Sequence, residues 1–285
     1  MMIIIGMVGV LLSIIVGYKM EQGNLSILFQ PAEFVIIGGS ALFALIITSG
    51  KEFSSILKNI SGIFKPPIGN KKNYLDLLLL LHNLFAKAQK EGLISLEPHI
   101  DAPDKSDIFK KFPFIMVYTK IRLCITDNLR ILISGGAPSQ LDSLIEIDIE
   151  TQHKEALYPS SILTKIADSL PGLGIVAAVL GVTLAMGKIA EPPEVLGHTV
   201  AAALVGTFLG VLLCYGFVGP IASYLEHQVH EEEVFFIAIK MALVAFAEGT
   251  HPMLAVEAGR RAIPTHGRPT FQEIEGEIRK WKGKA

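Results

Sequence analysis

The chain has 285 residues, of which 51% are hydrophobic and 18% are charged, and its mean hydropathy is +0.49. Soluble domains usually contain about 45–50% apolar and about 25% charged residues, so this composition indicates a membrane protein. The formal net charge of −2 offers no basic stripe for nucleic acid. The two cysteines, Cys124 and Cys214, lie far apart and in no ligand spacing, which argues against a disulfide and against a zinc site.

Four apolar stretches have about the length of 17–25 residues that a helix needs to cross a bilayer. In chain order they are 2–18, 34–50, 169–187 and 199–221. The first is interpreted as a retained membrane helix, because no Lys or Arg precedes it and no small-residue cleavage site follows it. The first two are short, so tilt or flanking residues must supply the missing length. We therefore expect an all-α integral membrane protein with four spans.

The segment between the second and third spans is too long for a linker and has helical periodicity. Its three patterns are separated by Gly-Gly and Pro breaks, and they cover 74–89, 120–134 and 140–155. The apolar run 234–247 is interrupted by Lys240 and follows three glutamates, so it is predicted to be an amphipathic helix. A small helical domain that includes the tail helix 222–247 is expected.

Positive charge orients the four spans. Of the 25 Lys and Arg residues, 23 lie in 51–168 and 222–285, whereas the short connections 19–33 and 188–198 carry one lysine each. Cytoplasmic loops carry the excess of Lys and Arg, so both termini are expected in the cytoplasm. The predicted organisation has four parts: a membrane hairpin over 1–50, a cytoplasmic helical domain over 51–168, a second membrane hairpin over 169–221 and a cytoplasmic helical tail over 222–285.

The third and fourth spans carry small residues at four-residue spacing, namely Gly174 and Ala178, then Gly206 and Gly210. In lipid, small residues let helix backbones approach closely. The partner helix can belong to the same chain or to another chain, and the sequence leaves both open.

Two prolines lie toward the cytoplasmic ends of these spans: Pro171 enters the third and Pro220 leaves the fourth. Pro171 fits the first turn of a helix, where the missing N–H costs nothing. Pro220 should free a carbonyl near Gly216, which is tolerated where protein or water covers it.

No Asp, Glu or His lies in the middle of a predicted span. Glu33 is placed at an outer edge and Asp168 at an inner edge, and Thr183 and Thr207 are the main polar residues inside. A proton relay in a membrane needs a titrating group. Either the chain moves no ions, or a partner chain supplies the carboxylate.

At these residues the chain resembles the MotA family, the four-span subunits of flagellar stators. The resemblance runs from Gln30-Pro31-Ala32-Glu33 to Arg268-Pro269-Thr270-Phe271 and rests on blocks in the right order: Asp168–Pro171, Gly174–Ala178, Val205–Gly210, and Tyr215–Phe217 with Pro220. It implies a homopentameric ring around two helices of a MotB-like partner. That partner spans the membrane once per chain, carries the ion-binding aspartate and anchors to peptidoglycan. The resemblance implies no cofactor.

The resemblance also implies which residues line the ion pathway. Pro171 and Pro220 match the family's two functional prolines, and Thr207 matches its pore-lining threonine. Sodium-driven relatives have a threonine where this chain has Ala178, which offers no oxygen to a hard cation. Proton coupling is therefore predicted.

The family contacts the rotor protein FliG through charges of the cytoplasmic loop. Glu97 and Glu150 match charged positions, whereas the family's arginine falls on Gln89. Lys90 is the predicted substitute, although it points about 100° away on a helix. Without the resemblance, these charges would be interpreted as a solvated helix face.

Other functions have weaker support. No catalytic triad, phosphate-binding loop or dinucleotide fingerprint is present, so an enzyme is not expected. His227 and His230 lie near one helical face, but a structural role is favoured over metal binding. The leading hypothesis is a proton-channel subunit of the bacterial inner membrane that drives a flagellar rotor. The alternatives are an energiser of the ExbB or TolQ type, which has three spans and an outside N-terminus, and a non-conducting membrane scaffold.

Overall fold

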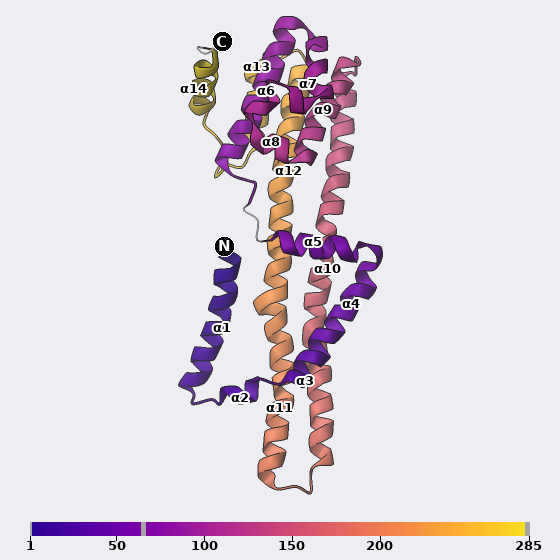
Figure 1. The fold of residues 1–285 in the computed structure, drawn as a ribbon, viewed down its shortest axis with the longest axis vertical. Helices are drawn as coiled ribbons and strands as arrows, with labels where there is room; N and C mark the ends of the chain where they lie inside the picture. The colour runs from indigo at the N-terminus through magenta and orange to yellow at the C-terminus, as the bar shows by residue number, and fades with distance from the viewer. Residues whose placement is uncertain (1, 64–66, 283–285) are drawn as a thin grey trace. The chain divides into compact units, whose positions relative to one another are not determined.

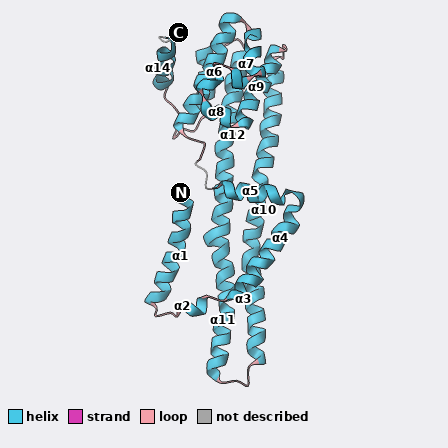
Figure 2. Cartoon of the chain, in the orientation of Figure 1, coloured by secondary structure: helices cyan, strands magenta, loops and turns pink. Residues whose placement is uncertain are grey.

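The computed structural model of the chain describes residues 2–63 and 67–282, and helices are the only regular structure in these two ranges (Figure 2). The all-α prediction is confirmed. Figure 1 labels the elements. The longer helices are α1 (Met2–Met20), α4 (Ser40–Ser49), α5 (Phe53–Gly62), α6 (Lys71–Glu91), α9 (Thr119–Ile133), α10 (Pro138–Gly187), α11 (Pro193–Leu212), α12 (Gly219–Ala247), α13 (Pro252–Ala262) and α14 (Phe271–Lys282). The short elements are α2 (Leu25–Leu28), α3 (Pro31–Phe34), α7 (Glu97–Asp101) and α8 (Pro113–Val117), the π-helical turns η1 (Val35–Gly39) and η6 (Leu213–Val218), and the 3₁₀ turns η2 (Gly50–Glu52), η3 (Leu93–Leu96), η4 (Pro103–Lys105) and η5 (Phe109–Lys111).

Four helical stretches are long and apolar enough to cross a membrane, which confirms the four-span prediction. They are Met2–Met20, Leu25–Ile60, Pro138–Gly187 and Pro193–Ala247. The second combines α2 to α5, and the fourth combines α11, η6 and α12. The chain is therefore a four-span integral membrane protein.

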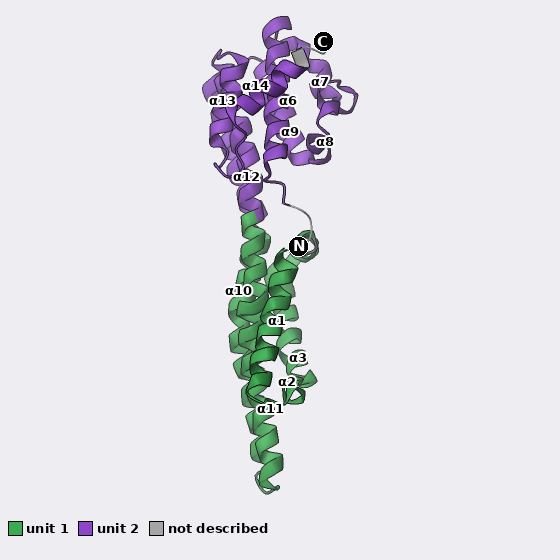
Figure 3. Cartoon of the chain, turned by 90° about the vertical axis from the view of Figure 1, so that its left-hand side faces the viewer, with its two compact units in different colours: residues 1–66, 157–227 green, residues 67–156, 228–285 purple. Residues whose placement is uncertain are grey.

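The chain divides into two compact units, which Figure 3 colours separately. Unit 1 comprises Met1–Pro66 and Leu157–His227, and unit 2 comprises Pro67–Ala156 and Gln228–Ala285. The predicted loop domain 51–168 thus contributes residues to both units. Its assignment to the cytoplasm stays a prediction.

Unit 2 contains the helices that the loop periodicity predicts. The patterns over 74–89 and 120–134 form α6 and α9, and the pattern over 140–155 forms the first part of α10. Local signals set their ends. The Asn70 side chain accepts a hydrogen bond from the backbone N–H of Asn73 at the start of α6, and Gly92, with φ +87°, ends it.

The core of unit 2 is made of large apolar side chains from α6, α9, α12 and α13. Residues Leu77–Leu81 of α6 are all buried. Two aromatic pairs connect α6 to α12: the ring centroids of Tyr74 and Phe235 lie 4.5 Å apart, and those of Phe85 and Phe246 lie 4.3 Å apart. Burial of such side chains stabilises a fold in water without other chains.

Unit 1 is held together differently. Its buried cluster draws mainly on α4, α10 and α11 and mixes Ile and Leu side chains with the smaller Ala41, Ala177 and Val205, and the described residues buried in it include no aromatic ring. Helix α1 contributes no buried residue. On α10, Ile175 and Val179 are 56% and 58% exposed. An apolar helix surface of this kind requires lipid or another protein around it.

Helix α10 places Pro171 differently from the sequence analysis. The helix starts at Pro138 and continues without interruption to Gly187, so Pro171 lies in its interior rather than in a first turn. The sequence before Pro171 contains no strong helix breaker except Pro159, and both prolines are accommodated. Proline has no N–H and therefore cannot donate to the carbonyl one turn earlier, here that of Ala167.

Candidate ion pathway

Small residues bring α10 and α11 into backbone contact in unit 1. An ideal Cβ built on Gly174 would lie 2.8 Å from the carbonyl oxygen of Gly206, and one on Gly210 would lie 2.6 Å from that of Leu170. A Cβ on Gly181 would lie 2.6 Å from the Cβ of Ala203. We call these positions the small-residue contact: Gly174, Gly181, Ala203, Gly206 and Gly210. The sequence left the partner helix open, and the structure shows packing within the chain.

Two of the predicted pathway residues come together at the small-residue contact. Thr207 follows Gly206 on α11, and the backbone nitrogen of Ala178 on α10 lies 3.1 Å from the Cβ position of Gly206. Both residues are partly exposed. Pro171 follows Leu170, whose carbonyl oxygen faces Gly210. Pro171 is therefore adjacent to the Leu170–Gly210 pair at the same interface of α10 and α11.

Pro220 lies beyond this contact, after a π-helical turn. The turn η6 spans Leu213–Val218, and the Gly219 N–H donates to the carbonyl of Cys214, five residues earlier. Pro220 is the second residue of α12. Wide turns of this type occur mostly at functional sites, because they change the helix register within a continuous helix. The pathway roles of Pro171, Ala178, Thr207 and Pro220 stay predictions.

Sequence reasoning missed the contact that Glu33 makes. The structure turns its carboxylate toward the small-residue contact. The side chain is 7% exposed, and its Oε2 lies 2.8 Å from the Cβ position of Gly206. A sequence signal did exist, because Glu33 is the only charged residue between Gln22 and Gly50.

The predicted rotor-contact residues all lie on unit 2 and are exposed. Lys90 and Gln89 are near the end of α6, and Glu97 begins α7. Glu150 lies on α10, where one of its carboxylate oxygens accepts a hydrogen bond from Lys154 Nζ at 2.6 Å. Lys90, Glu97 and Glu150 thus lie on three different helices. Their role stays a prediction.

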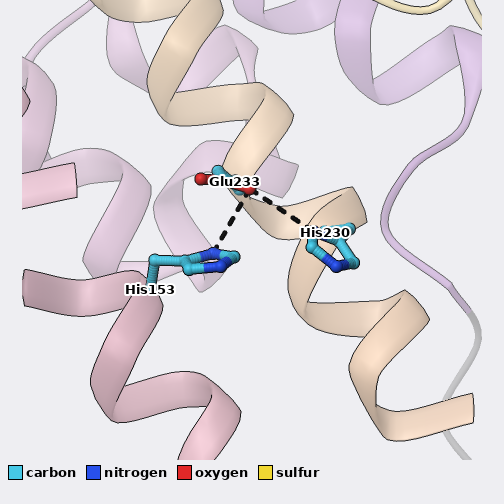
Figure 4. A group of neighbouring side chains, drawn as sticks. All are labelled: His153, His230 and Glu233. Atoms are coloured by element: carbon cyan, nitrogen blue, oxygen red, sulfur yellow. Dashed lines mark ion pairs between the residues drawn. The ribbon is translucent and has the colours of Figure 1, made fainter. Parts of the chain in front are cut away.

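Unit 2 also holds a polar cluster formed by two helices. His230 of α12 approaches His153 of α10 (Figure 4). The Oε2 atom of Glu233 lies 3.3 Å from His153 Nδ1 and 3.5 Å from His230 Nδ1. The three ligand atoms lie within 4.8 Å of one another, close enough to hold a transition-metal cation or to form ion pairs when an imidazole is protonated.

Burial shifts the pKa of several groups in unit 2. Loss of solvent, together with the nearby charge of Glu231, raises the pKa of Tyr74 to about 12. Burial raises the pKa of the Cys124 thiol to about 12. By contrast, the hydrogen bond from Lys71 Nζ lowers the pKa of Glu273 to about 2. Each shift follows from packing or pairing inside unit 2.

Comparisons with known proteins cover most of the chain. Residues 4–92 match the family model for the motility protein A N-terminal domain, and residues 117–236 match that of the MotA/TolQ/ExbB proton channel family. The chain belongs to the MotA family. Motility protein A of Salmonella typhimurium is 39% identical over 281 residues, which are 98% of this chain and 95% of that protein.

Two solved structures share the fold. The Campylobacter structure titled "Structure of C. jejuni MotAB" matches with a TM-score of 0.77 at 21% identity, covering 92% of this chain and 95% of that one. The flagellar MotAB stator complex from Bacillus subtilis matches with a TM-score of 0.76 at 20% identity, covering 94% and 98%. The motility protein A N-terminal match covers most of the first span and all of the second.

Proposed function

We propose that this protein is a stator subunit of the bacterial flagellar motor and forms a proton channel together with a MotB-like single-span partner. Five copies surround the partner's membrane helices in the inner membrane, with both termini in the cytoplasm. The protein is not an enzyme. The observation that carries this proposal is the family membership. It covers nearly the full length of the chain and therefore includes all four spans and the small-residue contact.

The arrangement of α10 and α11 supports a passive wall rather than a proton carrier. At Ala178 and Thr207 the two helices are held close by glycines, so little side-chain volume lies between them. Thr207 offers one hydroxyl, and Ala178 offers none. A wall with so few oxygens cannot replace the hydration shell of sodium, which favours proton coupling to a carboxylate of the partner.

Protonation of that carboxylate removes a charge whose burial is unfavourable. The stable arrangement of the surrounding helices therefore differs between the two protonation states. Pro171 and the π-helical turn before Pro220 are two of the places where α10 and the α11–α12 helix lack regular hydrogen bonding. We assign to them the bending that passes the change to unit 2, whose exposed charges Lys90, Glu97 and Glu150 contact FliG.

A flux measurement tests this function. The chain is coexpressed with its partner in an unplugged complex, and proton entry into vesicles is followed with a pH-sensitive dye. Thr207→Val should lower the flux, whereas Thr183→Val should not, because the Thr183 hydroxyl bonds to the carbonyl of Val179 on its own helix. Wild-type vesicles that assemble the complex and yet show no flux would favour the scaffold alternative.

A further inference from the structure

Glu33 is a buried acid that the pathway described above does not use. It lies in α3 of the second span, its side chain is 7% exposed, and its Oε2 has no hydrogen-bond partner among residues 2–63 and 67–282. An ionised carboxylate in such a place is strongly unfavourable unless something compensates it. A proton, a water molecule or a group of another chain must therefore complete this site.

The surroundings of Glu33 point toward the ion pathway. The Cβ position of Gly206 lies 2.8 Å from Glu33 Oε2, 3.0 Å from the Cβ of Ala177 and 3.1 Å from the backbone nitrogen of Ala178. Since Gly206 has no side chain, the carboxylate fits against the α11 backbone. The next residues on the two helices, Ala178 and Thr207, are those predicted to line the pathway.

No fixed charge on the neighbouring elements takes the role of counter-ion. Helix α11 carries Glu194 and His198, both at least two helical turns before Gly206. Helix α10 has no Asp, Glu, His, Lys or Arg between Asp168 and Gly187. Elements α2 and η1 carry none at all. A mobile proton is the counter-charge that this site accepts most readily.

We propose that Glu33 is a proton-relay residue, which takes protons from water on the outer side and passes them toward the partner's carboxylate. The inference rests on the proposed function and adds a titrating group that belongs to this chain. A hydronium ion gives its proton to a Glu33 carboxylate oxygen and becomes water. The resulting carboxylic acid then gives the proton, through water beside Gly206, to the partner's carboxylate. No electron moves.

The test compares two substitutions in the unplugged complex. Glu33→Gln keeps the shape but carries no transferable proton, and it should lower proton flux by about tenfold or more, as expected when a positioned proton-transfer group is lost. Glu33→Asp keeps a titrating group and should retain most of the flux. Flux is measured while the outer pH is varied, and the dependence on outer pH seen in the wild type should flatten in Glu33→Gln.

Controls separate the relay from a structural role and from the proposed function. Glu21→Gln removes an exposed acid of the outer connection and should leave the flux unchanged. Copurification with the partner shows whether each variant assembles. If Glu33→Gln conducts like the wild type, or conducts less with an unchanged pH profile, the relay is wrong and the stator function stands. If Glu33→Gln does not assemble, Glu33→Asp decides: an assembled Glu33→Asp complex whose flux no longer depends on outer pH overturns the relay. Absence of flux in the assembled wild type contradicts the stator function itself.

Discussion

Unit 1 and unit 2 are both helical, but they differ in how closely their helix backbones approach one another and in the size of the side chains between them. In unit 2, large side chains such as Phe85 and Phe235 fill a core that excludes water. In unit 1, glycines let α10 and α11 touch through their backbones, while Ile175 and Val179 remain exposed. In water, the hydrophobic effect drives the burial of large apolar side chains. Lipid provides no such driving force, so close packing is the main attraction between helices in a membrane.

The comparison teaches where each unit tolerates change. Unit 2 should lose stability when a large side chain becomes smaller. Unit 1 should lose its structure when a small residue becomes larger.

The largest effect is expected for Gly210→Leu in unit 1. The new side chain would start 2.6 Å from the carbonyl oxygen of Leu170, so α10 and α11 must separate. We expect loss of complex assembly, measured by copurification with the partner, and loss of motility. Gly172→Leu on α10 is the matched control, because nothing lies within 4 Å of its Cβ position. Equal behaviour of the two variants would show that the small-residue contact does not hold unit 1 together.

The next effect is expected for Phe85→Ala in unit 2. Phe85 is fully buried and stacks on Phe246, and such truncations typically cost about 3–5 kcal/mol. In detergent, the midpoint temperature for unfolding of unit 2, monitored by its susceptibility to proteolysis, should decrease. The membrane spans should still insert. Leu123→Ala, at a half-exposed position, should have little effect. A stability change in Phe85→Ala no larger than that control would contradict the assigned core.

A smaller effect concerns the attachment of α14 through Glu273. Lys71 Nζ lies 2.7 Å from Glu273 Oε1, and Thr270 and Glu273 form a capping box at the start of the helix. The folded-state pKa of about 2 lies below the ordinary value of 4.5, so this contribution is present above about pH 4.5 and is lost as pH falls toward 2. Hydrogen exchange in α14, corrected for the intrinsic pH dependence, should increase over that range.

The Glu273→Gln variant should show faster exchange in α14 already at neutral pH, with little further change on acidification. Glu275→Gln is the control, because Glu275 pairs with Arg279 of the same helix and not with α6. Identical pH profiles in the wild type and Glu273→Gln would mean that Lys71 does not anchor α14.

The smallest effect is chemical. Burial raises the pKa of Cys124 to about 12, so the reactive thiolate is scarce at neutral pH. In a Cys214→Ser chain, a water-soluble thiol reagent should label Cys124 slowly until unit 2 unfolds. Ser134→Cys in the same background provides an exposed thiol nearby on the chain, at the end of α9. Rapid labelling of Cys124 in the folded chain would contradict a dry core in unit 2.

Much of the fold could be predicted because its signals are local. Hydropathy and length identify the four spans, and helical periodicity with Asn70 and Gly92 identifies α6 to within a few residues. The family resemblance depends on short blocks of adjacent residues, so the sequence carries it in full. The position of Pro171 was not predictable. Pro171 lies inside a helix because the residues before it also form helix, and a proline alone does not decide between a helix start and an interior position.

The sequence by itself determined the all-α class, the four spans and the family, since each rests on residues that are near one another along the chain. Only the tertiary structure brought Glu33 against Gly206 and paired His153 with His230. These contacts join residues far apart in sequence, and their geometry depends on how closely two helices pack. Because Gly206 has no side chain, the carboxylate of Glu33 can lie against α11 at the place where α11 packs on α10.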